Sequence, residues 1–548
     1  MMTDRIASLW PEIVLFITLS IVILLGLSPQ AQWRRLTHWI TGLGLAIALL
    51  LSLYAPEVTG LPVPALAQFI KPAACIMGLL LLLGMSAVDD RLETRLAQGL
   101  KFDPLLTTRG EFLAFFLLSL IGLMLCTSAT DLIWLFLALE LTSLPTYVMV
   151  ASSRMKNVGH EAAVKYFFLG ALSAAIFLYG FALLYGATGS LHLDEIRAAL
   201  VAQYEETGSV SVLGLMGVIL SVVGISFKIA AVPMHFYTAD VYEGAATPVS
   251  AFLAFVPKTA GFVSIMLLGG MIVGLGEDGQ TWPEAFRVLL WVIAVVTMTV
   301  GNTMALLQSS VKRILAYSSI AHSGYVLIGI IAGPGLWAAG TGAAADSSIL
   351  TSNGFGAVVF YLLAYGVMNL GAFLVLACLH DPERHQDLES LDDLSGISRR
   401  HPWLAGAMAV CSLSLLGLPP LIGFFGKLYL FSAGVSAGEI PLVVIAGLNS
   451  AISAWYYLKL AGLPWLGQPS AVTDRLVPTP YLGRPAAAFL SAVGVLVLMV
   501  AGAPIMRAGS EATACDWGGA ASVAATTPSP IEAADQRQSM LPPDDIDP

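Results

Sequence analysis

The sequence predicts an all-α protein that crosses a membrane many times, and three observations support this fold class. Of its 548 residues, 57% are hydrophobic and only 11% are charged, and the mean hydropathy is +0.81. Apolar runs of about 20 residues, enough to cross a hydrocarbon layer roughly 30 Å thick, recur between Leu9 and Ala503 with short polar breaks. This pattern leaves no room for a sizeable soluble domain.

The apolar runs predict about fourteen helices. Their expected starts lie near residues 9, 36, 70, 110, 131, 160, 212, 248, 284, 312, 355, 403, 440 and 485. We expect helices 1–3 in residues 1–108, helices 4–8 in residues 109–280, helices 9–13 in residues 281–465 and a last transmembrane helix in residues 466–506. Residues 507–548 are rich in Ala, Ser, Thr, Pro and Asp without periodicity, which predicts a disordered acidic tail.

The basic residues predict the orientation, because cytoplasmic loops are enriched in Lys and Arg. Alternate loops carry them: Arg34, Arg35, Arg91, Arg95, Lys101, Arg109, Arg154, Lys156, Lys312, Arg313, Arg384, Arg399, Arg400, Arg475 and Arg484. The opposite loops carry almost none apart from Arg197, and both termini fall on this outer side. The first run lacks a basic start and a cleavage site, so we expect it to be retained as a span.

The charge and the cysteines exclude other classes. The net charge of −10 comes largely from a few loops and the tail, such as residues 387–393 and 544–547, and indicates no nucleic-acid surface. The five cysteines are scattered without C-x-x-C spacing, and no G-x-G-x-x-G follows a predicted strand. We therefore expect no metal or cofactor in this chain.

A faint internal repeat is visible. AVKYFFLGALSAAIFLYG from Ala163 can be laid over AVVFYLLAYGVMNLGAFL from Ala357, and ELTSLPTYVM from Glu140 over SSIAHSGYVL from Ser318. The offset of about 180 to 195 residues spans five helices, an odd number, so the second copy enters the membrane from the opposite face. Inverted repeats of this kind are typical of transporters, with the chemistry near the midplane and at broken helices.

Ionisable residues inside apolar runs are the main functional candidates, since each costs a few kcal/mol or more at the bilayer centre unless it is paired or hydrated. Five qualify, and they are Glu140, Lys165, Lys228, Lys258 and Lys427. Lys165 has Glu161 one turn before it and could instead snorkel to the interface.

Prolines beside two of these lysines predict broken helices. Pro233 follows Lys228, and Pro419 and Pro420 precede Lys427. Proline removes a backbone donor and frees carbonyls, which is tolerated at membrane depth where the break lines a cavity. A plain packing kink is the alternative interpretation.

These residue types suit proton transfer. Burial weakens the hold of a lysine on its proton and a nearby carboxylate strengthens it, so a moving carboxylate can load and unload the lysine. Glu140 is the natural partner for either Lys228 or Lys165, and the sequence does not decide between them. His235 and His322 could relay protons or could be hydrogen-bonded core residues. Side chains such as Ser319 and Tyr325 could hold a water chain or serve as packing contacts.

The motifs resemble a known family. AVPMHFYTADVYEGAATPVSAFLAFVPKTAGF, residues 231–262, resembles the central signature of the antiporter-like subunits of NADH:quinone oxidoreductase, respiratory complex I, and DVYEGAATPV resembles subunit N in particular. Further matching segments are ALELTSLPTYVMVA, EAAVKYFFLGALSAA, VKRILAYSSIAHSGYVLIG, FYLLAYGVMNLGAF and GLPPLIGFFGKLYLF. Together they cover most of residues 100–460. Two departures are a missing tryptophan in MHFYTAD and an alanine in EGAATP where proline is common.

The resemblance implies fourteen helices, two inverted five-helix repeats and two broken helices. It also implies roles: Glu140 as the carboxylate of the fifth helix, Lys228 as its broken-helix partner, Lys258 as the central relay and Lys427 as the terminal lysine. Lys165 matches the sixth-helix lysine of subunit N. Subunit M resembles this region with glutamate in place of Lys427, which favours subunit N.

The expected function is therefore proton translocation coupled to quinone reduction in partner subunits. NADH, FMN, iron–sulfur clusters and quinone would be bound by those partners, which include the other membrane-arm subunits and, indirectly, the redox arm. We expect a proton to pass from the Glu140–Lys228 pair through Lys258 and His235 to Lys427. The alternatives are a Na⁺/H⁺ antiporter subunit, the equivalent subunit of a photosynthetic ferredoxin-driven complex, and a scaffold that conducts nothing.

Overall fold

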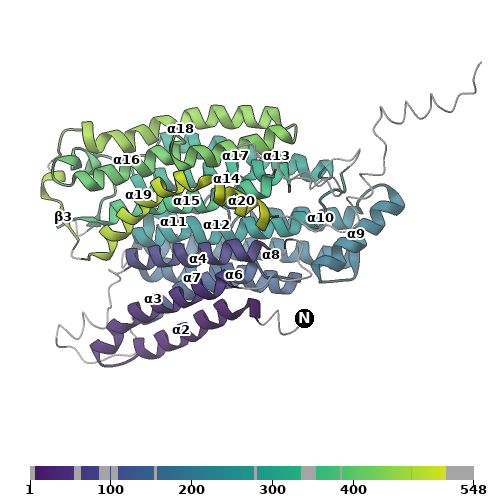
Figure 1. Cartoon of the computed structure of the whole chain (residues 1–548), viewed down its shortest axis with the longest axis horizontal. Helices are drawn as coiled ribbons and strands as arrows, with labels where there is room; N and C mark the ends of the chain where they lie inside the picture. The colour runs from purple at the N-terminus through teal and green to yellow at the C-terminus, as the bar shows by residue number, and fades with distance from the viewer. Residues whose placement is uncertain are drawn as a thin grey trace, which may run out of the picture.

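The structure is a computed structural model of the whole chain, and it describes residues 7–54, 63, 65–85, 99, 109–153, 157–276, 281–334, 353–382, 386–470, 472–479 and 481–513. Helices dominate these residues, and they pack side by side as an extended bundle (Figure 1). Six of the basic residues used for the orientation lie outside the described residues, and they are Arg91, Arg95, Lys101, Arg154, Lys156 and Arg384.

The main helices begin close to the positions that the sequence predicts. The first part of the chain forms α2 (Trp10–Gly26), α3 (Ala31–Leu53), α4 (Leu66–Gly84), α6 (Arg109–Cys126), α7 (Leu132–Ser153), α8 (Asn157–Thr188), α9 (Leu193–Thr207), α10 (Val212–Ile225), α11 (Thr238–Gly244) and α12 (Thr247–Gly270). The second part forms α13 (Glu284–Leu306), α14 (Val311–Ala332), α15 (Gly354–Ala377), α16 (Pro402–Leu416), α17 (Ile422–Ser436), α18 (Ile440–Leu466), α19 (Gly483–Val500) and α20 (Gly502–Ala512). The largest difference in a start is at α3, which begins at Ala31 instead of residue 36.

Eleven helices of the described residues are long and apolar enough to cross a membrane. Four apolar helices are shorter, namely α2, α10, α16 and α17. The all-α, polytopic fold class is thus confirmed, while the total of fourteen spans stays a prediction.

Both predicted helix breaks are present. Residues 226–237 separate α10 from α11 and contain Pro233, and residues 417–421 separate α16 from α17 and contain Pro419 and Pro420. The backbone turns through positive φ in each break, at Ala230 (φ 55°) and at Gly417 (φ 89°). Each break falls in the fourth helix of one of the two predicted five-helix sets.

Three helices form the centre of the bundle. Every residue in the apolar windows of α12 and α14 is buried, and 94% of the window of α15 is buried. In Figure 1 the N-terminal helices α2 and α3 lie along one edge of the molecule and α18 along the other. The ionisable groups in the middle of α12 and α14, Lys258 and His322, are therefore surrounded by protein on all sides.

The two ends of the bundle differ. One end carries a small antiparallel sheet in the order β2 (Gln386–Asp387), β1 (Leu379–Asp381) and β3 (Val477–Pro478). The other end carries α9, which the sequence analysis did not anticipate (Figure 1). Arg197 of α9 donates hydrogen bonds to the carbonyls of Gly270, Met271 and Val273 at the end of α12. The single basic exception on the predicted outer side thus caps a helix.

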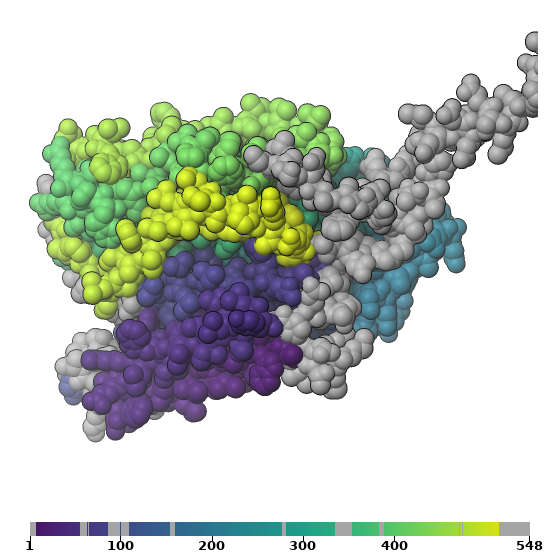
Figure 2. All heavy atoms as spheres, in the orientation of Figure 1, coloured from purple at the N-terminus to yellow at the C-terminus, as the bar shows by residue number. Residues whose placement is uncertain are grey.

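The predicted tail begins too early. Residues 507–512 belong to α20 instead of a disordered segment. The side-chain amide of Asn353 donates to the Ser510 carbonyl (3.3 Å) and to the Thr513 hydroxyl (3.1 Å), which fixes the end of α20 at the start of α15. Figure 2 shows α19 and α20 on the same face as the N-terminal helices. Residues 514–548 lie outside the described residues.

Glycines allow α8 and α10 to approach closely, as small residues do between membrane helices. A Cβ on Gly180 would lie 2.5 Å from the backbone nitrogen of Ser221, and one on Gly217 would lie 2.9 Å from that of Leu184. Because backbone atoms cannot move out of the way, neither glycine has room for a side chain. This contact positions α10, and with it the first helix break.

Replacing Gly180 with alanine should therefore destabilise the protein. Overpacking of a tight contact costs typically 1–3 kcal/mol, so we expect a lower midpoint of thermal unfolding in detergent and less protein in membranes. Gly447→Ala on α18 is the matched control, because a Cβ there meets no atom within 4 Å. Equal midpoints for the two variants would contradict the proposed packing constraint.

Candidate functional site

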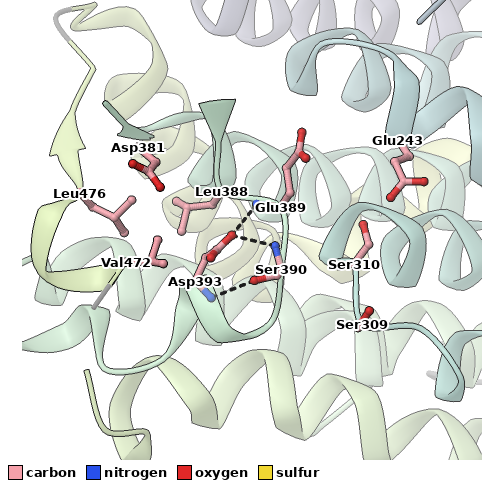
Figure 3. A pocket seen from close by; sticks show the side chains of 10 residues that line it. All are labelled: Glu243, Ser309, Ser310, Asp381, Leu388, Glu389, Ser390, Asp393, Val472 and Leu476. Atoms are coloured by element: carbon pink, nitrogen blue, oxygen red, sulfur yellow. Dashed lines mark hydrogen bonds between the residues drawn. The ribbon is translucent and has the colours of Figure 1, made fainter. Parts of the chain in front are cut away.

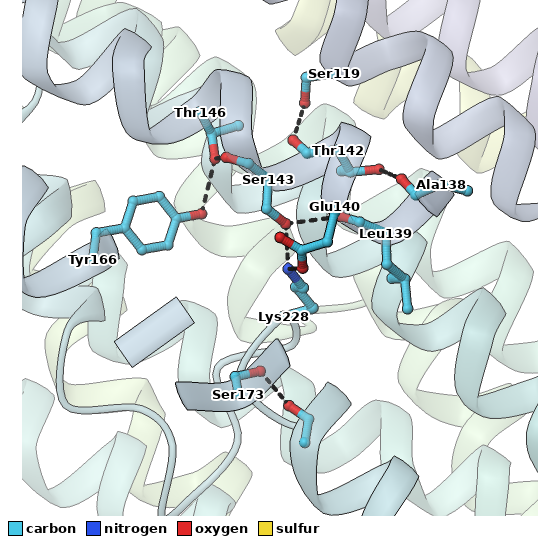
Figure 4. A network of polar contacts seen from close by, with 11 residues as sticks. Ser119, Ala138, Leu139, Glu140, Thr142, Ser143, Thr146, Tyr166, Ser173 and Lys228 are labelled. Atoms are coloured by element: carbon cyan, nitrogen blue, oxygen red, sulfur yellow. Dashed lines mark hydrogen bonds and ion pairs between the residues drawn. The ribbon is translucent and has the colours of Figure 1, made fainter. Parts of the chain in front are cut away.

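Glu140 and Lys228 form an ion pair inside the protein (Figure 4). The Lys228 ammonium lies 3.1 Å from Oε1 of Glu140, and it also donates a hydrogen bond to the Ser143 hydroxyl. The two side chains are 2% and 16% exposed. The choice that the sequence left open therefore falls on Lys228 as the partner of Glu140.

The helix break places Lys228 in this position. α10 ends at Ile225, so Lys228 lies in the turn region that follows it. Its ammonium is 5.9 Å from the ring centroids of both Phe177 and Phe227. A buried ammonium needs compensation, and here Glu140, Ser143 and the two ring faces provide it.

Lys165 belongs to a different cluster at the sheet-bearing end. Its ammonium lies 2.9 Å from Glu161 and 2.8 Å from Asp240, and its side chain is 45% exposed. Arg313 joins the same cluster through Asp240 (2.9 Å) and Glu243 (3.0 Å). These charges connect α8, α11 and α14, and we call Glu161, Lys165, Asp240, Glu243 and Arg313 the inner cluster.

Lys258 lies at the centre of the bundle with uncharged partners. Its ammonium donates to the Ser319 carbonyl (2.5 Å) and to the Ser323 hydroxyl (2.7 Å), both on α14. The Ser323 hydroxyl in turn donates to the carbonyl of Ile229 (2.6 Å) in the first helix break. One hydroxyl thus connects the central lysine to the segment that carries Lys228.

His322, one turn after Ser319 on α14, lies between two tyrosine hydroxyls. Its Nδ1 is 2.5 Å from the Tyr361 hydroxyl and its Nε2 is 2.7 Å from that of Tyr457. Tyr457 is also hydrogen-bonded to Ser318. The ring therefore links α14 to α15 and α18.

Tyr325 belongs to an adjacent polar group. Its hydroxyl accepts from the side-chain amide of Asn302 (3.0 Å), and Asn302 also contacts Asn449 and Tyr456. The Lys427 ammonium lies over the Tyr325 ring, 5.1 Å from its centroid. Tyr325 therefore lies between the α13–α18 amides and the second helix break.

Lys427 lies on α17, in its second turn after the second break. Its ammonium donates to the Leu416 carbonyl (2.7 Å) and to the Ser450 hydroxyl (3.0 Å). Leu416 is the last residue of α16, so its carbonyl has no partner within that helix and is available to the lysine. The break thus supplies an acceptor that a continuous helix would use itself.

His235 differs from the expected arrangement. Its ring lies against that of Phe236, with centroids 4.5 Å apart, and within the described residues it hydrogen-bonds to neither Lys258 nor Lys427. His322 is the histidine that has hydrogen-bonded partners at both ring nitrogens. A role for His235 stays a prediction.

The sequence analysis missed a second buried ion pair. Lys71 on α4 lies 2.7 Å from Oε1 of Glu12 on α2, and it donates to the Ser8 carbonyl (2.7 Å). Both residues fall near predicted helix starts, so they were not counted as intramembrane charges. Pro72, directly after Lys71 inside α4, was the available signal.

Lys312 was counted as a loop residue, but it lies in α14 with no exposed surface. It donates to the Ala245 carbonyl (3.1 Å), and its ammonium is 3.8 Å from Glu389. Beside it is a cavity of about 230 Å³. Figure 3 shows its lining of Glu243, Ser309, Ser310, Asp381, Leu388, Glu389, Ser390, Asp393, Val472 and Leu476.

One carboxylate of this cavity has a structural role. Asp393 accepts hydrogen bonds from the backbone nitrogens of Glu389 (3.2 Å) and Ser390 (2.9 Å), which fixes the turn (Figure 3). Asp381 is paired with Arg475 (3.1 Å) and Glu243 with Arg313. The cavity is acidic, but several of its charges are already neutralised within the chain.

Comparisons with known proteins agree with this architecture. Residues 129–453 match the family described as NADH:quinone oxidoreductase/Mrp antiporter, TM. The chain is 35% identical over 501 residues to the NADH-quinone oxidoreductase subunit N of Nitrosomonas europaea, covering 90% of this chain and 94% of the relative. It is 42% identical over 351 residues to the subunit N of Trichlorobacter lovleyi, covering 64% of this chain and 66% of the relative.

A solved structure shares the fold. A chain of respiratory complex I from Thermus thermophilus superposes with a TM-score of 0.70 at 32% identity, covering 91% of this chain and 99% of that chain. The chain therefore belongs to the antiporter-like family of transmembrane subunits described as NADH:quinone oxidoreductase/Mrp antiporter, and within that family it is similar to the subunits N.

Proposed function

We propose that this chain is a proton-translocating, non-redox subunit in the membrane arm of a bacterial NADH:quinone oxidoreductase. The observation that carries the proposal is the placement of one buried lysine at each helix break, with Lys258 and His322 in the core between the two breaks. The lysines, hydroxyls and imidazole of the proposed site suit proton transfer. NADH, FMN, iron–sulfur clusters and quinone would be held by partner subunits.

The Glu140–Lys228 pair is the loading element in this proposal. While the two side chains are in contact, the carboxylate favours the charged lysine. Separation of the pair leaves a desolvated ammonium, which favours release of its proton. Movement of the 226–237 segment is a suitable trigger, since it carries Lys228 and is bonded through Ile229 to Ser323.

The released proton would then pass through Lys258 toward Lys427. Both ammonium groups have only uncharged hydrogen-bond partners, so both sites favour release more than the Glu140–Lys228 site does. We place His322, with Tyr361 and Tyr457, on this route because it shares α14 with the Lys258 partners. This replaces His235 as the first choice for the relay.

The proposed orientation puts the sheet-bearing end in the cytoplasm and both termini outside, following the positive-inside rule. The described basic residues Arg313, Arg399 and Arg475 lie at or near this end, in the inner cluster or the segments next to the sheet. The opposite end has Arg197, which is engaged as a helix cap.

A Na⁺/H⁺ antiporter subunit is the main alternative, because the matched family includes both classes. Similarity to the subunits N over most of the chain favours the oxidoreductase. The described contacts do not separate an NADH-driven from a ferredoxin-driven complex, and the NAD(P)H-quinone oxidoreductase subunit 2 of a Synechococcus strain is also 35% identical over 500 residues. The inert scaffold has no support from the buried charges.

Association with a redox complex is the first prediction of this proposal. The tagged chain, purified after gentle solubilisation, should be part of a large complex that oxidises NADH with quinone and is inhibited at the quinone site. A small complex that exchanges Na⁺ for H⁺ without NADH would instead establish the antiporter alternative.

Lys228→Met should impair pumping, because it removes the titratable group of the ion pair. We expect fewer protons pumped per NADH oxidised or, with strict coupling, roughly 100-fold slower NADH oxidation, which is the lower end of the contribution of a positioned acid or base. Proton uptake and NADH oxidation, recorded together in inverted membrane vesicles, give the protons pumped per NADH and the rate of oxidation.

Two further variants make this test specific. Lys459→Met removes an exposed lysine that lies over Trp455 on α18, and it should pump normally. The double variant Glu140→Gln, Lys228→Met avoids an unpaired buried carboxylate, so its defect cannot be ascribed to that penalty. Normal pumping by the assembled double variant would refute the proposed role of the pair.

The two histidines separate the alternative routes. His322→Gln should slow proton uptake strongly, since the imidazole bridges Tyr361 and Tyr457. His235→Gln should have a smaller effect, because its ring contacts Phe236. The reverse order of effects would return the relay to His235.

A further inference from the structure

A row of polar side chains extends from the ion pair along α7. Glu140, Ser143 and Thr146 are spaced three residues apart, which places them on one face of the helix. Figure 4 shows this face turned toward Lys228 and Tyr166. The Lys228 ammonium contacts the first two, and the Thr146 hydroxyl lies 3.2 Å from the hydroxyl of Tyr166 on α8.

Tyr166 belongs to a closed group of aromatic rings. Its ring stacks on Tyr237 (centroids 5.0 Å apart, planes 15° apart) and on Phe227 (5.7 Å, 28°), and Tyr147 packs edge-on against it (4.6 Å, 89°). All four residues are at most 6% exposed. One member of this aromatic group, Phe227, borders the ion pair directly, with its ring centroid 5.9 Å from the Lys228 ammonium.

The aromatic group also borders the inner cluster. Tyr166 directly follows Lys165, and Tyr237 stands three residues before Asp240. On the other side, Phe227 directly precedes Lys228, and the Tyr237 hydroxyl donates to the Phe227 carbonyl (2.8 Å). The rings therefore separate a partly exposed set of charges from a buried one.

The hydroxyls are more than the packing requires. Phenylalanine would fill the same stack as Tyr166, and valine has nearly the shape of Thr146. The Thr146 hydroxyl is placed to donate either to the Ser143 carbonyl (2.6 Å) or to the Tyr166 hydroxyl (3.2 Å). When its single proton is in the shorter bond, its oxygen is able to accept the proton of Tyr166. The two hydroxyls are thus in contact within one turn of Ser143, whose own hydroxyl donates to the Leu139 carbonyl (3.0 Å) and accepts from Lys228.

We propose that the hydroxyls of Tyr166 and Thr146 relay protons between the inner cluster and the Glu140–Lys228 pair. This inference deepens the proposed function and rests on it. Tyr166 and Thr146 then belong to the proton route, and the aromatic group restricts entry to that route.

Each transfer in the relay conserves charge. Tyr166 gives its proton to Thr146, Thr146 gives its own to Ser143 after rotating away from the Ser143 carbonyl, and Ser143 protonates neutral Lys228. Tyr166 regains a proton from water on the inner side. Every oxygen releases one proton and receives one, and the net change is one proton taken from the inner aqueous phase by Lys228.

Three variants of the whole complex test the relay. Tyr166→Phe removes one oxygen and keeps the ring stack, and Thr146→Val removes the neighbouring hydroxyl. Thr142→Val is the matched control, because Thr142 is equally buried one turn earlier on α7 and, like Thr146, donates to a carbonyl of its own helix, that of Ala138 (2.9 Å). Of the two, Thr146 is the threonine whose hydroxyl contacts Tyr166. Initial rates of NADH oxidation and proton uptake in inverted vesicles are measured for each.

We expect coupled proton uptake to fall roughly 100-fold in Tyr166→Phe and Thr146→Val, which is the lower end of the range for positioned proton-transfer groups. Thr142→Val should match the wild type, and Thr146→Ser should restore uptake. Lower pH on the cytoplasmic side, which is the medium outside inverted vesicles, should partly rescue proton uptake by Tyr166→Phe. Direct protonation from the medium then replaces the relay. A purely structural role would not produce this rescue.

The outcomes separate this inference from the proposed function. Normal uptake in both hydroxyl variants, with loss in Lys228→Met, would overturn the relay and leave the proposed function intact. Normal uptake in Lys228→Met would overturn the proposed function itself. If Tyr166→Phe does not assemble, the comparison of Thr146→Val with Thr142→Val decides, and equal rates in that pair would refute the relay.

Discussion

The cost of holding a charge inside a membrane is the constraint from which the rest of this structure follows. An unpaired lysine at the bilayer centre costs several kcal/mol, so a retained lysine must find acceptors within the protein. Lys228 has a carboxylate and a hydroxyl, whereas Lys258 and Lys427 rely on backbone carbonyls and serine hydroxyls. A continuous helix uses its carbonyls internally, and the breaks make some of them available.

The same constraint explains the packing. Charges on α12 and α14 can be compensated only if other helices surround them, and both helices are buried along their full apolar windows. Close approach between helices then requires small residues, as in the contact of Gly180 with α10. The few polar positions in the interior need hydrogen-bond partners from several neighbouring helices. The central helices are therefore surrounded by other helices.

Much of the fold and part of the candidate site could be predicted from the sequence. Apolar runs locate the helices to within a few residues because the membrane fixes their length. Buried lysines and adjacent prolines located both breaks. The partner of Glu140 was undecided, because the sequence places both Lys228 and Lys165 in apolar runs and does not show which run packs against that of Glu140. In the tertiary structure Lys165 pairs with Asp240 and Lys228 with Glu140.

The failures have physical reasons too. Glu12 and Lys71 lie near the starts of their helices, where a single charge usually reaches water, so their pairing across α2 and α4 was not foreseen. Lys312 was counted as a loop residue for the same reason. The sequence analysis named both His235 and His322 as possible relays and placed His235 on the expected route, which stays untested. The fold brings α15 and α18 against His322, and sequence distance carries no information about that contact.

Continuity of the polar groups also bears on how such a protein could store energy. A proton path that is connected at all times would dissipate the gradient across the membrane. In the described residues, the Glu140–Lys228 pair reaches Lys258 only through the Ile229 carbonyl and Ser323, and a carbonyl accepts hydrogen bonds but has no proton to pass on. The connection is therefore mechanical: it transmits movement of the first break to the partner of Lys258 without conducting. Coupling then requires that the break move, and separation of the ion pair on that segment is part of the energetic cost of the movement.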